Sequence, residues 1–522
     1  MRRTVVIVAV AALLAAPAAL AGRASEPAPR GPGLLELGAY GHALIQLRRD
    51  VAGPPGATLV SRRLNVWRLP RRDAMRALPS LLAARTVEHV EPDRELELLA
   101  AQADELSEFE WWRPRVGADR ATPPGPGKAL TVIDSGLDVS HPEFAGRANT
   151  ALMNPQRFDE SDGEFHGTAV SSVAAAPENG VGVVGVYPQA VLRMWDAGAP
   201  LVSRVIQGLE AAMDAGPGVI NISLGFSFDD LLEKAILQAV GTGSLVVAAA
   251  GNDREQGSPA TFPANLNHVL TVAATDENDQ PTAFSNASLG VDLAAPGQNI
   301  PAAIAFSGWE YVDGTSFSSP LVAGAAAWVW TARPTLDNTQ LFDLIRWTAR
   351  DVGRQGFDPD TGFGVLDIPS ALSAAAPATD GQEPNDDIEH IKANGLFRNA
   401  ARPLTAAGRP RATVNARLDA TEDPEDVYRV WVPANRVVRA TVTTNTDVDV
   451  DLWRSTTRSV LARGAERRRF LITTSAKRGR VAERVLVRNR TRRGFFVYLD
   501  VYLRENGPGD ADYRATIATA RR

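Results

Sequence analysis

Residues 129–136 read Ala-Leu-Thr-Val-Ile-Asp-Ser-Gly, a short apolar run that ends in a carboxylate and a turn. Similar apolar runs recur further along the chain, with stretches of helical length between them, and they lie at residues 219–222, 245–250 and 269–274. The separating stretches include residues 202–215 and 230–241. Continuous apolar strands that alternate with helices are typical of a parallel sheet covered on both faces. Ligands bind beyond the carboxyl ends of such strands, so Asp134 is predicted to lie at a site.

Two further motifs lie at predicted helix starts in the same segment. His166-Gly167-Thr168 precedes a helix of small residues, and Gly314-Thr315-Ser316 opens another. A serine hydroxyl needs an imidazole to accept its proton, and the imidazole needs a carboxylate that fixes its tautomer. Taken singly, each motif is more often a turn or a helix cap. Because all three occur at a strand end or helix start of one α/β segment, Asp134, His166 and Ser316 are predicted to form a catalytic triad.

The segment from Trp111 to about Ala375 resembles the subtilisin-like serine proteases, whose triad has the same chain order of aspartate, histidine and serine. Beyond the triad, the resemblance rests on six motifs: Asp138-Val139-Ser140-His141-Pro142-Glu143-Phe144, Ser223-Leu224-Gly225, Ala249-Ala250-Gly251-Asn252, Phe262-Pro263-Ala264, Ala295-Pro296-Gly297 and Gly362-Phe363-Gly364-Val365-Leu366-Asp367. It implies an α/β fold with a subtilisin-like doubly wound parallel sheet. It also implies a serine endopeptidase that hydrolyses peptide bonds.

The resemblance assigns roles to residues outside the triad. Asn252 lies at the family's oxyanion-stabilising asparagine, and its amide can donate a hydrogen bond to an oxyanion. The implied substrate-binding residues would pair with the peptide as an added strand and line the specificity pocket, and they are Ser223, Leu224, Gly225, Ala250 and Gly251. Two departures concern specificity. The segment 193–203 lacks a glycine-rich stretch that many relatives have, and Thr261 can reshape the pocket.

The chemistry itself requires no cofactor, and a structural calcium ion is left open. The loop 177–183 resembles a family calcium loop that binds mostly through backbone carbonyls. Glu143 and Asn179 fall where relatives place side-chain ligands. Calcium takes about six to eight oxygens, whereas only these two side chains are candidates. A loop with calcium and a loop without it are therefore both retained as alternatives.

The amino terminus predicts secretion. Two arginines precede an apolar stretch at residues 4–14, and Ala19-Leu20-Ala21 offers a small-residue cleavage site. Residues 1–21 are therefore predicted to be a signal peptide, because the apolar stretch is shorter than the roughly 20 residues of a membrane span. No later segment is long and apolar enough to span a membrane. We expect a secreted, extracellular protein.

Residues 22–108 are predicted to be a propeptide, with a compact part at about 41–93. The sequence of that part predicts strands at 42–47, 64–69 and 86–90 and a helix at 73–84. It resembles the inhibitory, ferredoxin-like α+β propeptide of subtilases in His42-Ala43-Leu44-Ile45-Gln46-Leu47 and Val87-Glu88-His89-Val90-Glu91-Pro92-Asp93. The implied protein is a zymogen inhibited by its own propeptide. We predict self-cleavage between about Asp93 and Glu110.

After the predicted catalytic domain, 109–375, a linker at 376–388 leads to a segment of alternating valine, threonine, arginine and aromatic residues. This alternation predicts a β-sandwich domain at 389–522. Glu383-Pro384-Asn385-Asp386 and residues 425–430 resemble the pre-peptidase C-terminal domain of secreted bacterial peptidases. The arginine-rich stretch 454–493 leaves two interpretations open, namely attachment to an anionic surface or a solvated β face.

The composition limits the other possibilities. The chain has 522 residues, 44% hydrophobic and 22% charged, which is ordinary globular composition. A formal net charge of -6 argues against nucleic acid as a partner, and we expect protein or peptide substrates and a monomer. The absence of cysteine excludes disulfides and a thiol nucleophile. Two other functions are alternatives. One is a non-catalytic binding protein on a protease fold, and the other is an α/β-hydrolase esterase, whose Gly-x-Ser-x-Gly motif does not surround Ser316.

Overall fold

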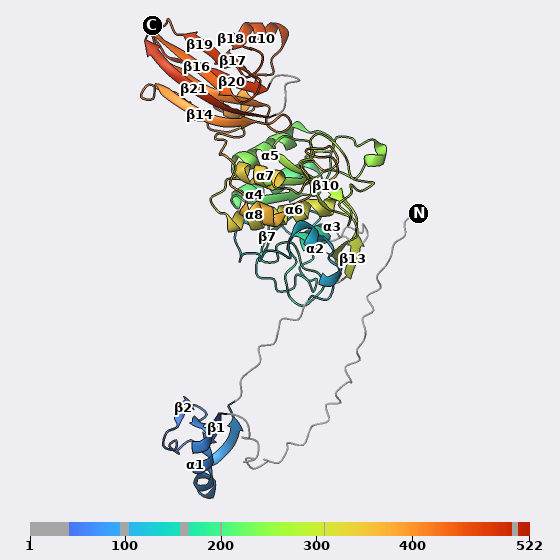
Figure 1. Ribbon diagram of the computed structural model, residues 1–522, viewed down its shortest axis with the longest axis vertical. Helices are drawn as coiled ribbons and strands as arrows, with labels where there is room; N and C mark the ends of the chain where they lie inside the picture. Colours follow the sequence, from blue (N-terminus) through green and yellow to red (C-terminus); the bar gives the residue numbers. More distant parts are fainter. Residues whose placement is uncertain are drawn as a thin grey trace. The chain divides into compact units, whose positions relative to one another are not determined.

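The computed structural model of the protein describes residues 41–93, 104–156, 166–198, 201–306, 308–503 and 510–521 (Figure 1). The predicted signal peptide, residues 1–21, lies outside the described residues. The described chain falls into two compact units, residues 41–93 and residues 104–521.

The amino-terminal unit is a four-stranded antiparallel sheet with one described helix. The strand order is β2-β3-β1-β4, with bounds β1 (His42–Leu47), β2 (Thr58–Ser61), β3 (Val66–Pro70), α1 (Arg71–Ala83) and β4 (Val87–Pro92). Alternate residues of β1, namely Ala43, Ile45 and Leu47, are fully buried in one cluster with Leu78 of α1, as the two-residue period of a strand requires. The predicted strands and helix are confirmed within a few residues. Strand β2 was not predicted, because none of its residues is buried and its sequence shows no apolar face.

The second unit begins with a seven-stranded sheet in which all the paired strands run parallel. Its order is β11-β10-β9-β8-β5-β7-β6, with bounds β5 (Ala129–Asp134), β6 (Thr150–Leu152), β7 (Val191–Asp196), β8 (Val219–Ile222), β9 (Leu245–Ala249), β10 (Val269–Thr275) and β11 (Leu293–Pro296). Strands β5, β8, β9 and β10 are buried at every residue. This burial explains their continuous apolar sequences.

Helices cover both faces of this sheet (Figure 1). Helices α3 (His166–Ala175) and α6 (Thr315–Ala332) share one core with Val132, whereas α4 (Val202–Asp214) and α5 (Asp230–Gly241) share another with Ile133. Neighbouring residues of β5 thus point to opposite faces. The remaining elements are η1 (Ser107–Phe109), α2 (Trp112–Val116), η2 (Arg254–Gln256), the hairpin of β12 (Ile300–Ile304) and β13 (Gly308–Val312), α7 (Asn338–Trp347) and α8 (Ile368–Ser373). The predicted doubly wound α/β fold is confirmed.

The order of the strands reverses next to β5. Strands β6 and β7 lie on one side of β5, and β8 to β11 lie on the other. The carboxyl ends of β5 and β8 therefore flank a topological switch point, where open α/β sheets bind their ligands. Asp134 ends β5, and Ser223 directly follows β8.

The carboxyl-terminal region consists of two four-stranded antiparallel sheets, with orders β14-β21-β16-β19 and β15-β20-β17-β18 (Figure 1). The bounds are α9 (Ile388–Ile391), β14 (Arg411–Leu418), β15 (Glu425–Val432), β16 (Arg436–Thr444), β17 (Val448–Arg454), α10 (Gly464–Phe470), β18 (Leu471–Ser475), β19 (Glu483–Arg488), β20 (Phe495–Leu503) and β21 (Ala511–Arg521). Residues of both sheets form one core. The sandwich prediction is confirmed. The alternating sequence predicted strands at 427–432, 437–443, 448–453, 495–502 and 513–517, so β14, β18 and β19 were not predicted. Within the described residues, none of the helices has the length and apolar character that crossing a membrane demands.

Candidate active site

Asp134 and His166 are in direct contact at the carboxyl end of β5. His166 Nδ1 lies 2.8 Å from Asp134 Oδ1, which also accepts the N–H of Ser135 at 2.7 Å. Asp134 is completely buried, whereas the His166 side chain keeps 33% of its surface exposed. A buried carboxylate therefore holds one ring nitrogen, and the imidazole opens toward solvent. This is the arrangement that a general base needs.

Ser316 lies in the first turn of α6, which neighbouring groups hold in place. Its Oγ is 3.5 Å from the main-chain oxygen of Ser223, and Ser223 Oγ donates to the main-chain oxygen of Ser316 at 2.9 Å. The ring of Phe317 lies 5.7 Å from the ring of His166. The helix start that carries Ser316 is thus packed against His166 and against the carboxyl end of β8. The structure brings the three predicted triad residues to one edge of the sheet.

The small residues of α3 and α6 have a packing role. A Cβ atom on Gly324 of α6 would lie 2.8 Å from the main-chain oxygen of Ala174 in α3. Only glycine can occupy that position without moving one of the helices. The run of small residues that the sequence shows after Ser316 therefore lets α6 approach α3 closely, and this approach sets the position of the helix start.

Asn252 and the backbone of Ser316 form the candidate oxyanion site. Asn252 Oδ1 accepts two hydrogen bonds from Thr315, from its N–H at 2.9 Å and from its hydroxyl at 3.0 Å. These bonds orient the amide, so that its NH₂ group is the part left to donate. A Cβ on Gly314 would lie 3.4 Å from Asn252 Nδ2 and 3.6 Å from Ser316 N, so both donors face a space that glycine keeps open. Thr315 and Gly314 were not predicted as site residues, although they lie inside the Gly-Thr-Ser motif.

The residues predicted to bind substrate flank Ser316 and Asn252. Ser223 contacts Ser316, and Gly225 is exposed two residues further on. Phe226 pairs with Phe262 through two main-chain hydrogen bonds of 2.7 and 3.0 Å. The predicted residues of the opposite wall, Ala250 and Gly251, immediately precede Asn252. The two predicted walls therefore converge beside Ser316.

Thr261 lies between these two walls. A Cβ on Gly225 would be 2.7 Å from Thr261 Cγ2, and a Cβ on Gly251 would be 2.8 Å from Thr261 Oγ1. One side chain therefore touches both walls.

The two side chains predicted as calcium ligands lie together, Glu143 in the segment between β5 and β6 and Asn179 in the loop after α3. Asn179 Nδ2 donates to the main-chain oxygen of Glu143 at 3.1 Å, and Asn179 Oδ1 accepts the N–H of Val181 at 3.0 Å. Glu143 Oε2 accepts from Val183 N–H and Trp309 Nε1, and burial raises the pKa of Glu143 to about 8. Within the described residues, Glu143 Oε1 is the one oxygen of the two side chains that lacks a partner. The two side chains alone do not supply the roughly six to eight oxygens of a calcium ion. Binding here would rest mostly on backbone carbonyls of the loop 177–183, so calcium at this loop stays a prediction.

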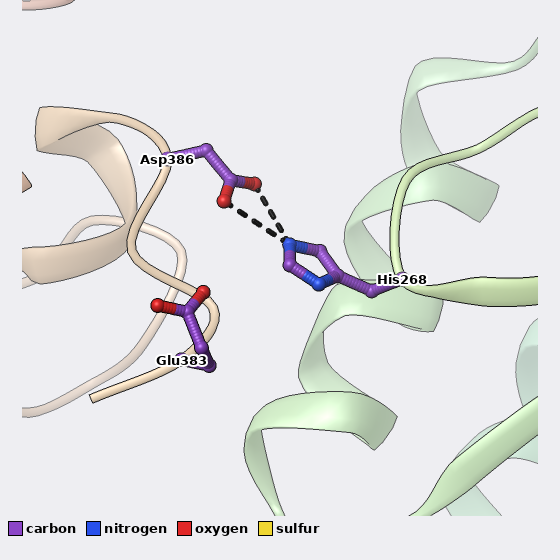
Figure 2. A group of neighbouring side chains, drawn as sticks. All are labelled: His268, Glu383 and Asp386. Atoms are coloured by element: carbon purple, nitrogen blue, oxygen red, sulfur yellow. Dashed lines mark hydrogen bonds and ion pairs between the residues drawn. The ribbon is translucent and has the colours of Figure 1, made fainter. Parts of the chain in front are cut away.

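Another group of acidic side chains lies away from the triad. His268, which precedes β10, contacts both carboxylate oxygens of Asp386 through Nε2, at 3.0 and 3.1 Å (Figure 2). Glu383 lies beside them, and ligand atoms of the three residues are within 4.8 Å of one another. An overlapping group contains Asp380, Glu383, Asp423 and Asp426. Neither group was predicted, although acidic residues are concentrated at 380–387 and 419–426.

Comparison with known proteins gives one consistent result. A model of the subtilase family matches residues 125–364. The chain is 34% identical over 254 residues to a subtilisin of Bacillus pumilus. This match covers 47% of this chain and 91% of that protein. It is 36% identical over 234 residues to subtilisin Savinase of Lederbergia lenta. This match covers 44% of this chain and 86% of that protein. It is 34% identical over 254 residues to subtilisin E of Bacillus subtilis, and it spans 66% of the length of that relative.

Solved structures include similar chains. The crystal structure of a psychrophilic subtilisin-like protease from Pseudoalteromonas sp. AS-11 covers 51% of this chain and 99% of its own, with 19% identity and a TM-score of 0.45. The sequence matches to the subtilisins carry the assignment. The chain belongs to the subtilase family of peptidases.

Proposed function

We propose that the protein is a secreted serine endopeptidase that is made as a self-processed zymogen and hydrolyses peptide bonds. One observation carries the proposal, the 2.8 Å contact between His166 Nδ1 and the buried Asp134 Oδ1 beside the turn that holds Ser316. Membership of the subtilase family supports the same chemistry. Protein or peptide chains are the proposed substrates, and a monomer is the proposed working form.

Each residue of the site has a role in the proposed reaction. Ser316 Oγ attacks the carbonyl carbon of the scissile bond, while His166 takes its proton and later gives it to the leaving amine. Asp134 holds the imidazole and stabilises its protonated form. Asn252 Nδ2 and the Ser316 N–H donate to the oxyanion of the tetrahedral intermediate. Water then attacks the acyl-enzyme with the help of His166, and the mechanism calls for no cofactor.

The substrate is proposed to bind as an added β-strand along residues 223–225. Extended peptides that pair with an exposed strand gain affinity from main-chain hydrogen bonds and specificity from side-chain pockets. The exposed Gly225 and its contact with Thr261 support this placement. Ala250 and Gly251 are proposed to form the opposite wall of the primary pocket.

The compact unit at 41–93 is proposed to be the inhibitory propeptide. The contacts of the next described segment indicate where mature sequence begins. Asp104 Oδ1 accepts the N–H groups of residues 179–181 at 3.1, 3.1 and 3.2 Å, and the N–H of Leu106 donates to the oxygen of Gly182 at 2.8 Å. These bonds tie residues 104–106 to the catalytic domain. They support self-cleavage on the amino-terminal side of Asp104, within the range that the sequence predicts.

The test compares full-length wild type with Ser316→Ala and Asn252→Ala, using casein hydrolysis, peptide kinetics and intact mass. Wild type is expected to cleave casein and lose its prosegment, whereas Ser316→Ala does neither. Asn252→Ala is expected to lower kcat about 10²- to 10³-fold, the loss seen for such a donor in subtilisin, a relative. Ser373→Ala, an exposed serine at the end of α8, is the matched control and keeps full activity. Folded wild type that cleaves no protein or peptide would overturn the proposal and favour a binding protein.

A further inference from the structure

Basic side chains are concentrated in and around strand β19 of the sandwich. Residues 476–494 contain eight basic residues and one acidic residue, whereas the whole chain has a formal net charge of -6. The acidic residue, Glu483, is completely buried. The basic residues are all exposed, and they are Lys477, Arg478, Arg480, Arg484, Arg488, Arg490, Arg492 and Arg493. The positive charge of this segment is therefore local and lies at the surface.

The outer face of the sheet β14-β21-β16-β19 continues this charge (Figure 1). Buried and exposed residues alternate along β19, so Arg484 and Arg488 point away from the core. Strand β16 pairs with β19 and carries Arg439 on the same side. Strand β21 separates β16 from β14, and its Ala518 lies opposite both Arg439 and Arg411. We call the four exposed arginines of this sheet the basic face, namely Arg411, Arg439, Arg484 and Arg488.

Small and hydroxylated side chains separate the arginines of the basic face. Arg439 and Arg411 are two strand spacings apart, or about 9–10 Å. Arg484 begins a row that runs across the sheet and continues through three threonines, Thr441, Thr516 and Thr413. None of the exposed residues of these four strands is aromatic, and Leu486 is their one exposed large apolar residue. The face is thus flat, positive and rich in hydroxyl groups.

The arginines of the basic face take part in none of the ion pairs within the described ranges of the chain. Neighbouring basic residues do have acidic partners. Arg417 pairs with Asp510 and Asp512, and Arg467 pairs with Asp451. Like charges on adjacent strands repel one another. An anionic partner that neutralises the basic face would therefore remove a repulsion that the protein itself leaves in place.

The catalytic domain does not cover the basic face. The cavity at the junction of the two domains is lined by Phe342 of α7 together with Asn415, Thr443 and Arg514 of the sandwich. These three sandwich residues form one row at the end of the sheet that is nearest to the catalytic domain. Arg439 lies four residues before Thr443, about 13 Å further along β16. The basic face is therefore open to a partner in the complete chain.

Protection of an edge strand explains only part of this charge. Exposed edge strands often carry charged residues, which prevent pairing with other chains. This role accounts for Arg484 and Arg488, because β19 is an edge strand. It does not account for Arg439 on the inner strand β16, nor for the six basic residues in the loops that flank β19. A continuous positive face of this extent indicates a partner with many negative charges.

We propose that the basic face binds an acidic polysaccharide, which lies across the strands with its carboxylate or sulfate groups on the arginines. Guanidinium groups form paired, charge-assisted hydrogen bonds with such anions. The threonine hydroxyls can donate to and accept from the hydroxyls of the sugar rings. Nucleic-acid bases would need aromatic side chains on which to stack, and a membrane would need an apolar face rather than one leucine. The bound polysaccharide would hold the protein at a surface that carries it.

The test uses the full chain with Ser316→Ala, so that self-digestion cannot contribute, and heparin as the acidic polysaccharide. Binding is measured by isothermal titration over a range of NaCl concentrations. The parent is expected to bind heparin and to lose affinity as the salt concentration rises. The triple variant Arg439→Gln/Arg484→Gln/Arg488→Gln is expected to bind about 10- to 100-fold more weakly, with a salt dependence that falls by about one unit of slope for each arginine.

A second triple variant removes the same charge from exposed positions of the amino-terminal unit, Arg62→Gln/Arg63→Gln/Arg72→Gln. It is the matched control and should keep the affinity of the parent for heparin. All six substituted arginines are exposed, so both variants are expected to fold, and an unchanged Tm checks this. The measurement requires no peptidase activity, so its outcome is independent of the proposed function.

Three results would overturn the proposal. Absence of heparin binding by the parent at about 0.15 M NaCl, which needs no variant to fold, removes the partner. Equal weakening in the two triple variants removes the assigned surface. Tighter binding to duplex DNA or to phosphatidylglycerol vesicles than to heparin, at equal concentrations of negative charge, would assign the basic face to a nucleic acid or a membrane instead.

Discussion

At the scale of single residues, Thr261 determines how much room remains in the proposed specificity pocket. Its hydroxyl donates to the oxygen of Pro259 at 3.3 Å and accepts from Nδ2 of the buried Asn286 at 3.2 Å. These bonds hold a β-branched side chain that already has few rotamers. The methyl group is therefore kept against Gly225, between the two walls. We therefore expect a preference for a small substrate side chain at this position.

Replacement of this residue should widen the preference of the enzyme. We expect Thr261→Gly to raise kcat/KM for peptides with phenylalanine before the cut, relative to alanine, by about 10- to 200-fold. The measurement is the ratio for a matched pair of peptides. Thr242→Ala, at the exposed end of α5, is the control and should leave the ratio unchanged. An unaltered ratio in Thr261→Gly would contradict the assignment, whereas no cleavage of either peptide by wild type would contradict the proposed activity instead.

At the scale of elements, buried carboxylates from the segment before α2 hold the loop that follows α3. Glu110 Oε1 accepts the N–H of Val184 at 2.9 Å, and Glu110 is almost fully buried. Burial raises the pKa of Glu110 from 4.5 to about 8, against a smaller lowering effect of Arg113. A carboxyl with a raised pKa binds its proton more tightly in the folded state. Its contribution to stability is therefore complete below about pH 4.5 and is lost as the pH rises toward 8.

Because the pKa of Glu110 is raised in the folded state, the melting temperature is expected to depend on pH. In the Ser316→Ala background, Tm should fall between pH 5 and pH 9, and the fall should be smaller in Glu110→Gln, which keeps the acceptor oxygen but carries no charge. The measurement is thermal unfolding by circular dichroism across that range. Glu108→Gln changes an exposed glutamate of the same segment and should reproduce the parent curve. Identical pH dependence in Glu110→Gln and its parent would show that this carboxyl does not titrate as described.

At the scale of the whole molecule, Arg346 of α7 joins the catalytic domain to the sandwich. Its guanidinium is 3% exposed and contacts Asp292 and Asp343 of the catalytic domain and Asp419 of the sandwich region, at 3.4, 2.8 and 2.9 Å. Removing one partner from such a buried group leaves the others as uncompensated charges. This cost is much larger than the worth of an exposed ion pair.

Arg346→Met is therefore expected to lower the free energy of unfolding by about 3–5 kcal/mol. Arg350→Met, which breaks the more exposed pair with Asp279, should cost about 0–1 kcal/mol. Urea denaturation of both variants in the Ser316→Ala background measures the difference. Equal losses of unfolding free energy in the two variants would show that burial does not increase the stabilisation that the ion pairs of Arg346 provide.

The sequence by itself determined the order of the elements and the candidates for the reacting groups. Strands such as β5 and β9 are buried on both faces, so their apolar runs are visible without any knowledge of their neighbours. Asp134, His166 and Ser316 could be predicted because each follows a strand or begins a helix. Strand β19 was missed because its inward residues include a buried glutamate and its outward residues include arginines. The sequence of β19 therefore does not alternate between apolar and polar residues in the way that predicts a strand.

Tertiary structure alone decided which distant residues meet. Asn252 and Gly314 enclose one space because α6 packs closely on α3, and Thr261 spans the pocket because Phe226 and Phe262 pair. Asp380 and Asp423 come together only when the linker folds back along β15. Periodicity reports how a residue faces its own strand or helix. It carries no information about contacts between segments far apart in the chain, and these contacts set the shape of the pocket and the charge at the junction.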